Sequence, residues 1–275
     1  MTAITADNER LARQAIALME LFALNHDDTE QRIVGVCQRA VTPFGAVAAV
    51  CVQPRHVSLA RTTLDRLQAR EVNVVAVINF PHGGRGIESA VSETRAALMG
   101  GADEVDVVYP FGALLCGDQQ AGTELISACK SVLDPRIKLT VTLETGELRD
   151  SENIHTACRC AIEAGADFVK TSTGKAARHA TPQAARIMLE CIADIGGQVG
   201  FKVAGGLRTF EEARLFMQLA QARFGAHWTS SERVRLGGSS LLDDLLARLG
   251  LHGAFTAPPF LEGKKRPGKE PGQKP

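Results

Sequence analysis

The amino-acid sequence predicts an α/β protein, and within that class a (β/α)8 TIM barrel with extra N-terminal helices. Two observations carry this prediction. Short, continuously apolar runs alternate along the chain with longer segments of helical periodicity, which is the pattern of a parallel sheet covered by helices. The length of 275 residues is close to the usual size of one such barrel. A doubly wound open sheet is the alternative, but its glycine-rich GxGxxG turn after a first strand is absent.

The N-terminal region predicts two helices before the repeat begins. Residues 8–24 carry apolar side chains at helical spacing, among them Leu11, Ala15 and Leu18. A second helix is expected at residues 29–40, behind polar residues suited to cap it. We expect these two helices to form a lid or plug ahead of the barrel.

From residue 46 onward, segments typical of strands and helices alternate. The seven clear strands are expected at residues 46–52, 73–80, 104–110, 137–144, 167–172, 199–206 and 233–238. The helices after them are expected at residues 54–69, 87–99, 119–133, 152–164, 182–195, 210–223 and 240–249. A closed barrel of this class needs one more strand. We expect it at residues 225–228.

Charge and composition favour a small-molecule partner. The chain has 31 basic and 31 acidic residues and an isoelectric point near 7.0, so no global field attracts nucleic acid or a membrane surface. Hydrophobic residues make up 45% of the chain and aromatic residues only 5%, which predicts a large core of aliphatic side chains and alanine. Such a core suits a barrel filled with small and branched residues.

Residues 1–257 are expected to form one barrel domain. Residues 258–275 are rich in lysine and proline and poor in apolar residues, which predicts a disordered tail. The seven cysteines show no CxxC spacing, and no signal peptide or long apolar span is evident. These features predict free thiols and a cytoplasmic protein.

Three ionisable residues interrupt apolar strands and form a candidate catalytic set. Asp106 lies within the third expected strand, Lys170 ends the fifth, and Lys202 lies in the sixth. Catalytic groups of barrel enzymes project from the carboxyl ends of strands. A second positive charge and a dry surrounding both disfavour an ammonium ion, so Lys202 is expected to lower the pKa of Lys170 and leave it a neutral nucleophile. The alternative is a purely structural ion pair between the lysines and Asp106.

Glycine- and hydroxyl-containing turns after the late strands predict an anion site, where this class of barrel commonly binds phosphate. The candidate residues are Thr173, Gly174, Lys175, Gly205, Gly206, Gly237, Gly238, Ser239 and Ser240. Arg208 follows the second glycine pair. No metal site is expected, because the seven histidines are scattered without HxH or HxxxH spacing. Cys51, near the expected barrel mouth, is a possible substrate contact, although a core cysteine is the simpler reading.

Five motifs give the chain its resemblance to a known family. In order they are ADEVDVVYP at 102–110, LETGEL at 143–148, GADFVKTSTGK at 165–175, GFKVAGGLRT at 200–209 and RLGGSSLL at 235–242. Together they resemble the deoxyribose-phosphate aldolase family from about residue 18 to residue 249.

The resemblance implies a metal-independent barrel without a cofactor. It implies reversible cleavage of 2-deoxy-D-ribose 5-phosphate to D-glyceraldehyde 3-phosphate and acetaldehyde through a lysine imine. By similarity, Lys170 forms the imine, Lys202 perturbs it, and Asp106 serves proton transfer with Lys202. Lys175, Gly205, Gly206, Ser239 and Ser240 match positions near the phosphate in the family, and a homodimer is common in the family.

Three departures from the family pattern bear on substrate range. Glu20 stands where better-known bacterial members have an aspartate, and Phe22 stands where they have a threonine, so both are possible substrate contacts. A C-terminal tyrosine of some members is missing, since the only tyrosine is Tyr109. Two alternatives therefore stay open: a Schiff-base aldolase for a different aldehyde, and a non-catalytic barrel that binds a sugar phosphate.

Overall fold

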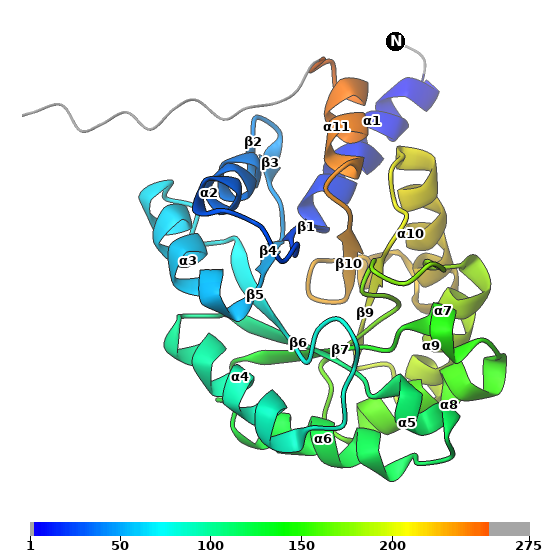
Figure 1. The fold of residues 1–275 in the computed structure, drawn as a ribbon. Helices are drawn as coiled ribbons and strands as arrows, with labels where there is room; N and C mark the ends of the chain where they lie inside the picture. Colours follow the sequence, from blue (N-terminus) through cyan, green and yellow to red (C-terminus); the bar gives the residue numbers. More distant parts are fainter. Residues whose placement is uncertain (1–2, 253–275) are drawn as a thin grey trace, which may run out of the picture.

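The structure, a computed structural model, describes residues 3–252. Parallel strands close into a barrel in the order β1-β10-β9-β8-β7-β6-β5-β4, and helices surround it (Figure 1). The predicted (β/α)8 class is therefore confirmed. The tail expected at 258–275 lies outside the described residues.

The helices and strands agree closely with the expected repeat from β4 onward. The barrel strands are β1 (Met19–Ala23), β4 (Ala49–Val52), β5 (Asn73–Ile78), β6 (Glu104–Val108), β7 (Lys138–Thr142), β8 (Phe168–Lys170), β9 (Gly200–Ala204) and β10 (Val234–Gly237). The outer helices are α2 (Glu30–Arg39), α3 (Val57–Arg66), α4 (Ile87–Met99), α6 (Gln120–Ser131), α8 (Ser151–Glu163), α9 (Pro182–Asp194), α10 (Phe210–Phe224) and α11 (Leu241–Arg248). Shorter elements are the hairpin β2 (Val41–Thr42) and β3 (Gly45–Ala46), the helices α5 (Phe111–Leu115) and α7 (Thr145–Leu148), and the 3₁₀ turns η1 (Pro54–His56) and η2 (Ala226–Trp228).

The expected helix at 8–24 is wrong in its second half. Helix α1 (Ala3–Ala17) ends there, and β1 follows directly as the first barrel strand, hydrogen-bonded to both β10 and β4. The segment MELFA has apolar residues that fit a helical spacing, but its true period is two: Met19 and Leu21 face the helices, whereas Glu20 and Phe22 face the barrel interior.

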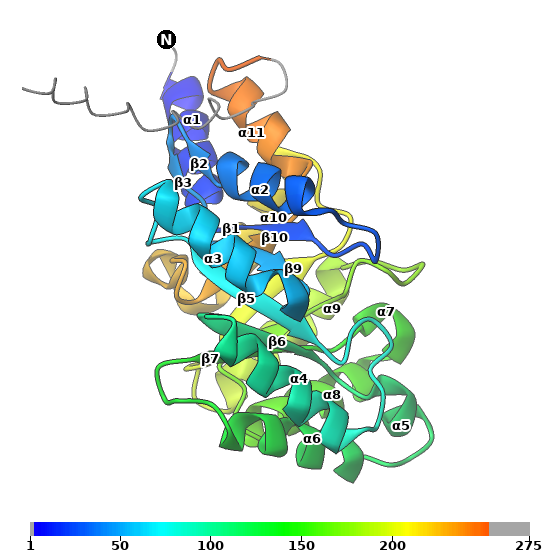
Figure 2. The same ribbon diagram turned by 60° about the vertical axis from the view of Figure 1, so that its left-hand side comes forward.

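The expected lid or plug is also wrong, because residues 19–23 form a barrel strand between the two helices. Helix α2 is the crossover from β1 to β4 and covers the barrel like the other helices, while α1 packs beside α11 and α10 (Figures 1 and 2). Of the two expected N-terminal helices, only α1 is an addition to the barrel repeat.

The eighth strand is therefore β1, and the segment 225–228 is not a strand. It forms the 3₁₀ turn η2, where the Trp228 ring stacks on Phe224 with ring centres 4.2 Å apart. Gly225 has a φ of 87°, which allows the chain to leave α10 and turn sharply into η2.

Each barrel strand presents one face to the helices and the other to the interior. The outward residues of the strands join the helices in one large apolar core. The inward residues divide into two sectors. An apolar sector lies on β4 and β5, and ionisable side chains occupy β1, β6, β8, β9 and β10. The ionic sector holds the candidate catalytic residues.

No helix within residues 3–252 is both long enough and apolar enough to cross a membrane.

Candidate active site

Lys170 and Asp106 form a buried ion pair inside the barrel. Lys170 ends β8, and its Nζ donates to Oδ2 of Asp106 at 2.7 Å, with the two side chains 2% and 1% exposed. Thr142, on the intervening strand β7, donates its hydroxyl to the other carboxylate oxygen at 2.6 Å. Both oxygens of Asp106 are therefore engaged, which orients the carboxylate toward Lys170.

The ionisation of Lys170 differs from the sequence-based expectation. Burial alone would lower the pKa of Lys170, but the negative charges around it, first that of Asp106, outweigh burial and raise the pKa above its ordinary value. The charge in contact with Lys170 is a carboxylate rather than the ammonium of Lys202. The expectation that Lys202 leaves Lys170 neutral is therefore wrong for the free protein.

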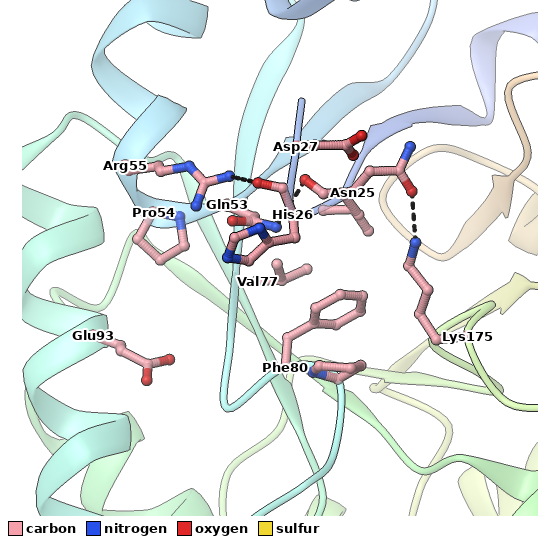
Figure 3. A pocket seen from close by; sticks show the side chains of 12 residues that line it. Asn25, His26, Asp27, Gln53, Pro54, Arg55, Val77, Phe80, Glu93 and Lys175 are labelled. Atoms are coloured by element: carbon pink, nitrogen blue, oxygen red, sulfur yellow. Dashed lines mark hydrogen bonds between the residues drawn. The ribbon is translucent and has the colours of Figure 1, made fainter. Parts of the chain in front are cut away.

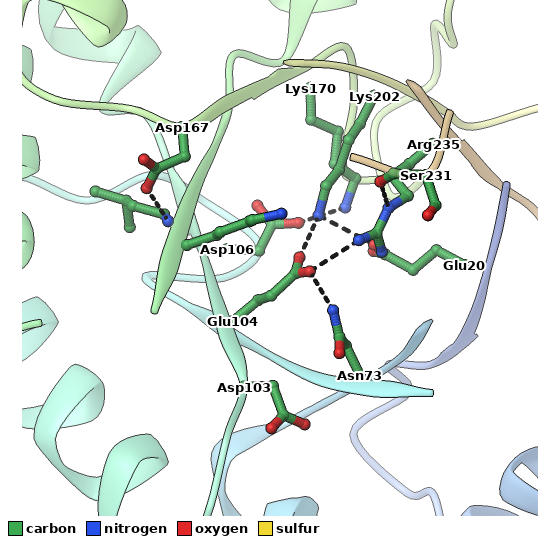
Figure 4. Close-up of polar contacts among 12 residues, drawn as sticks. Glu20, Asn73, Asp103, Glu104, Asp106, Asp167, Lys170, Lys202, Ser231 and Arg235 are labelled. Atoms are coloured by element: carbon green, nitrogen blue, oxygen red, sulfur yellow. Dashed lines mark hydrogen bonds and ion pairs between the residues drawn. The ribbon is translucent and has the colours of Figure 1, made fainter. Parts of the chain in front are cut away.

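Lys202 is held by two other carboxylates. Its Nζ donates to Glu20 at 3.1 Å and to Glu104 at 3.0 Å (Figure 4). Burial alone would lower the pKa of Lys202, but these acids outweigh it and raise the pKa. Arg235 donates to Glu104 at 2.9 Å, and Asn73 donates to the same oxygen at 2.8 Å. We call Glu20, Glu104, Asp106, Lys170, Lys202 and Arg235 the ionic cluster.

Glu104 and Arg235 were not among the residues predicted for the site. Glu104 lies two residues before Asp106 in β6, so both side chains face the interior. Arg235 stands opposite Lys202 in the register of β9 and β10. This period of two was readable in DEVDVV and RVRLGG, and it is the signal that could have found them.

Glu20, Cys51 and Asp106 come close enough to raise the question of a metal ion, since their ligand atoms lie within 4.8 Å of one another. Both carboxylates, however, already bind a lysine ammonium. Burial raises the pKa of the Cys51 thiol well above its ordinary value, which disfavours the thiolate that a metal needs. These groups therefore suit lysine cations better than a metal ion.

Phe22 lies between the ionic cluster and the mouth of the barrel. Its ring centre is 5.0 Å from the Nζ of Lys170. Gly237 on β10 makes room for the ring, because a Cβ there would lie 2.5 Å from the Cζ of Phe22. Phe22 also lines the adjoining anion pocket, so one ring borders both that pocket and Lys170.

All but one of the residues predicted to bind an anion line a single cavity of about 300 Å³, which we call the anion pocket. Of the predicted set it is lined by Thr173, Gly174, Lys175, Gly205, Gly206, Gly237, Gly238 and Ser240. Arg208 lines it as well, so the pocket has two exposed cationic side chains, those of Lys175 and Arg208. Asn25 and His179, which the sequence did not single out, also line it.

A buried carboxylate anchors the turn after β8. Glu144 accepts hydrogen bonds from the backbone N–H of Thr173 at 3.1 Å and from its hydroxyl. The Thr173 hydroxyl in turn accepts from the N–H of Lys175 at 3.0 Å. Burial raises the pKa of Glu144 despite these bonds. Thr173 therefore shapes the turn that presents Gly174 and Lys175 to the pocket.

Ser239 does not line the anion pocket. Its hydroxyl accepts from the N–H of Phe22 at 3.1 Å, which joins the loop after β10 to β1. Its neighbour Ser240 lies at the pocket and immediately precedes α11. The two serines thus have different surroundings although they are adjacent in sequence.

Comparisons with known proteins agree with this geometry. The model of the DeoC/LacD aldolase family matches residues 14–246. An apo structure from Toxoplasma gondii ME49, provisionally assigned as a deoxyribose-phosphate aldolase, is 26% identical, with a TM-score of 0.83 over 89% of this chain and 98% of that one. A protein of the same provisional assignment from Coccidioides immitis is 26% identical, with a TM-score of 0.72 over 87% and 94%. The aldolase QR15 is 28% identical, with a TM-score of 0.70 over 86% and 97%.

Proposed function

The chain belongs to the DeoC/LacD family of aldolases, and from this premise we propose that it is a lysine-imine aldolase, a metal-independent lyase. Its proposed reaction is the reversible cleavage of 2-deoxy-D-ribose 5-phosphate to D-glyceraldehyde 3-phosphate and acetaldehyde. The observation that carries the proposal is the buried pair of Lys170 and Asp106 beside a cationic, glycine-lined pocket.

Imine formation needs a neutral Lys170, and Asp106 is placed to accept its proton at 2.7 Å. The ionic cluster contains three basic and three acidic side chains, so its net charge is zero when all are ionised. Transfer of a proton from Lys170 to Asp106 keeps that sum at zero and so creates no buried net charge. The neutral amine then attacks C1 of the sugar, and loss of water gives the iminium ion.

The iminium nitrogen accepts the electron pair released when the bond between C2 and C3 breaks. A base removes the proton of the C3 hydroxyl, which becomes the carbonyl of D-glyceraldehyde 3-phosphate. The remaining two-carbon enamine is protonated at C2, and hydrolysis releases acetaldehyde and restores Lys170. We assign these proton transfers to Asp106 acting with Lys202. Lys202 belongs to the same cluster, where its ammonium group lies between the carboxylates of Glu20 and Glu104.

The anion pocket supports the phosphorylated substrate. Lys175 and Arg208 supply positive charge, and the turns at Gly174, Gly205 and Gly206 have positive φ values of 79°, 88° and 84°, which bring backbone close to a ligand. A phosphate held there leaves the other end of the sugar directed past Phe22 to Lys170. A different aldehyde is the second candidate, because the Phe22 ring narrows this passage.

A cleavage assay tests the proposed substrate. Release of D-glyceraldehyde 3-phosphate from 2-deoxyribose 5-phosphate should be measured beside release of glyceraldehyde from unphosphorylated 2-deoxyribose. We expect a clear preference for the phosphorylated sugar, and a Lys170→Arg variant should be inactive on both. Equal turnover of the two sugars would contradict the phosphate site, and binding without any turnover would favour the non-catalytic barrel.

The seven cysteines are free thiols, which supports our proposal of a reducing compartment such as the cytoplasm. The homodimer implied by the family resemblance stays a prediction, which light scattering at several protein concentrations tests.

A further inference from the structure

A cavity of about 280 Å³ lies between helix α7 and the beginnings of α8 and α9. These three helices lie on the same side of the molecule in both views (Figures 1 and 2). We call this space the flank cavity. Its lining includes the polar side chains of Thr145, Arg149, Asp150, Arg178, His179 and Thr181.

Two arginines from different loops give the flank cavity positive charge. Arg149 lies between α7 and α8, Arg178 lies in the loop between β8 and α9, and both are exposed at the cavity. Within residues 3–252, neither guanidinium group forms an ion pair or donates a hydrogen bond. The carboxylate of Asp150 is engaged elsewhere, because its two oxygens accept from the backbone N–H and the side-chain amide of Asn153, each at 2.8 Å. Both cations are therefore available to an anion.

Close packing joins the two segments that carry these arginines. A Cβ on Gly146 of α7 would lie 2.5 Å from the carbonyl oxygen of Arg178, so the two backbones are in direct contact. Glu144, which immediately precedes α7, accepts from the N–H of Thr173 at 3.1 Å. The loop after β7 is thus fixed to the loop after β8 at two points, and one ligand can reach both Arg149 and Arg178.

A buried hydroxyl group in the wall of the flank cavity lacks a partner. Thr145 lines the cavity and is 4% exposed, and its Oγ1 has no hydrogen-bond partner within the described residues. Buried hydroxyl groups in proteins are in most cases hydrogen-bonded to protein or to ordered water. An oxygen-rich occupant of the cavity would supply the missing partner.

We propose that the flank cavity is a second anion site, separate from the anion pocket, and that it binds a phosphate group. The carrier is inorganic phosphate or a small phosphate monoester. One guanidinium group can engage both oxygens of a carboxylate by itself, whereas two from different loops require an anion with more oxygens. A phosphate group has these oxygens, and those left over accept from the hydroxyl groups of Ser151 and Thr181.

The flank cavity and the anion pocket share one side chain, that of His179. His179 packs on two glycine turns of the anion pocket, since a Cβ on Gly205 would lie 3.2 Å from its Nδ1 and a Cβ on Gly206 would lie 3.3 Å from its Cβ. The same loop supplies Lys175 to the anion pocket, where its Nζ donates to Oδ1 of Asn25 at 2.8 Å (Figure 3). The two anion sites are therefore neighbours, and a test must distinguish them residue by residue.

Phenylglyoxal modification of arginine, followed by peptide mapping, gives this resolution. The rate is measured at each arginine with increasing inorganic phosphate or glycerol 3-phosphate, at constant ionic strength. At about ten times the half-protecting concentration, modification of Arg149 and Arg178 should be about tenfold slower. Arg95, an exposed arginine on α4 that lines neither cavity, should react at an unchanged rate. The carrier that protects at the lower concentration is the preferred one.

Arg149→Gln and Arg95→Gln form a matched pair of variants. Arg149→Gln removes one of two cations that hold the same phosphate, so the half-protecting concentration at Arg178 should rise roughly tenfold. Arg95→Gln should leave it unchanged. Protection of Arg178 that is the same in both variants would overturn a site shared by the two arginines.

The remaining outcomes separate this proposal from the proposed function, on which it does not rest. Protection of Arg208 in the anion pocket without protection of Arg149 and Arg178 would overturn the second site and leave the proposed function standing. Protection of Arg149 and Arg178 by succinate but not by phosphate would overturn the assignment of a phosphate group. Slowing no greater than that at Arg95 would show screening of charge alone and would also overturn the site.

Discussion

The ionic cluster and the anion pocket both deal with charge, but they are built in different ways. The cluster pairs lysine and arginine with carboxylates that are all about 2% exposed or less. The pocket relies on glycine turns and on the exposed side chains of Lys175 and Arg208. Loss of one partner in the cluster leaves a buried charge uncompensated, whereas water replaces a lost partner in the pocket. The cluster should therefore determine stability and protonation, and the pocket should determine affinity.

The largest expected effect is on stability and comes from Glu104→Gln. This change leaves Arg235 buried without its carboxylate, which should lower the free energy of unfolding by about 3–5 kcal/mol. The control is Glu232→Gln, which breaks a surface pair with Lys138 at a carboxylate that is 65% exposed and should cost less than about 1 kcal/mol. Urea unfolding of both variants measures the difference. Equal losses would mean that burial does not distinguish the cluster from a surface pair.

The same residue predicts a pH dependence of stability. Burial alone would raise the pKa of Glu104, but Lys202 and Arg235 outweigh it and lower the pKa from 4.5 to about 2. A carboxylate whose pKa is lowered in the folded state stabilises the protein above pH 4.5, and this contribution is lost as the pH falls toward 2. The stability difference between the parent protein and Glu104→Gln should therefore shrink as the pH falls from 4.5 toward about 2. A constant difference in urea unfolding would contradict this assignment.

A smaller effect is expected at the pocket. Lys175→Gln removes one exposed cation from the phosphate site, so KM for 2-deoxyribose 5-phosphate should rise roughly tenfold while kcat changes little. Unphosphorylated 2-deoxyribose should show no change, which makes it the internal control. A fall in kcat with KM unaltered would place Lys175 in the chemistry rather than in phosphate binding.

The smallest effect is expected at Ser239. Because its hydroxyl bonds the backbone of β1 and does not line the pocket, Ser239→Ala should cost about 1 kcal/mol of stability and leave KM within about twofold. Ser240→Ala is the comparison, since Ser240 lies at the pocket. A large rise in KM for Ser239→Ala alone would show that the two serines are assigned the wrong way round.

The sequence predicted the barrel because seven of its strands are continuous apolar runs, and such runs are typical of strands covered on the outside by helices. It did not predict β1, whose five residues are too few to distinguish a period of two from a helical spacing. The family resemblance named Glu20 and Phe22 as possible substrate contacts, but the strand that turns both side chains into the barrel interior came from the structure.

At the candidate site, too, some residues were predicted from the sequence and others were found only in the structure. Asp106, Lys170 and the glycine turns were found because each is unusual in its own stretch of sequence. Glu104, which binds Lys202, and Arg235, which binds Glu104, were not found, because their contacts form only when strands far apart in the chain pair side by side. The direction of the Lys170 pKa depended on the same packing, since it is set by which charge comes into contact with the amine.

The central claim is that Lys170 is the amine that forms the imine. Incubation with acetaldehyde and sodium borohydride, followed by peptide mapping, tests it most directly. The account predicts one stable ethyl adduct, on Lys170, with Lys202 unmodified because two carboxylates hold its ammonium. An adduct on Lys202 or elsewhere in place of Lys170, or no adduct at all, would contradict it.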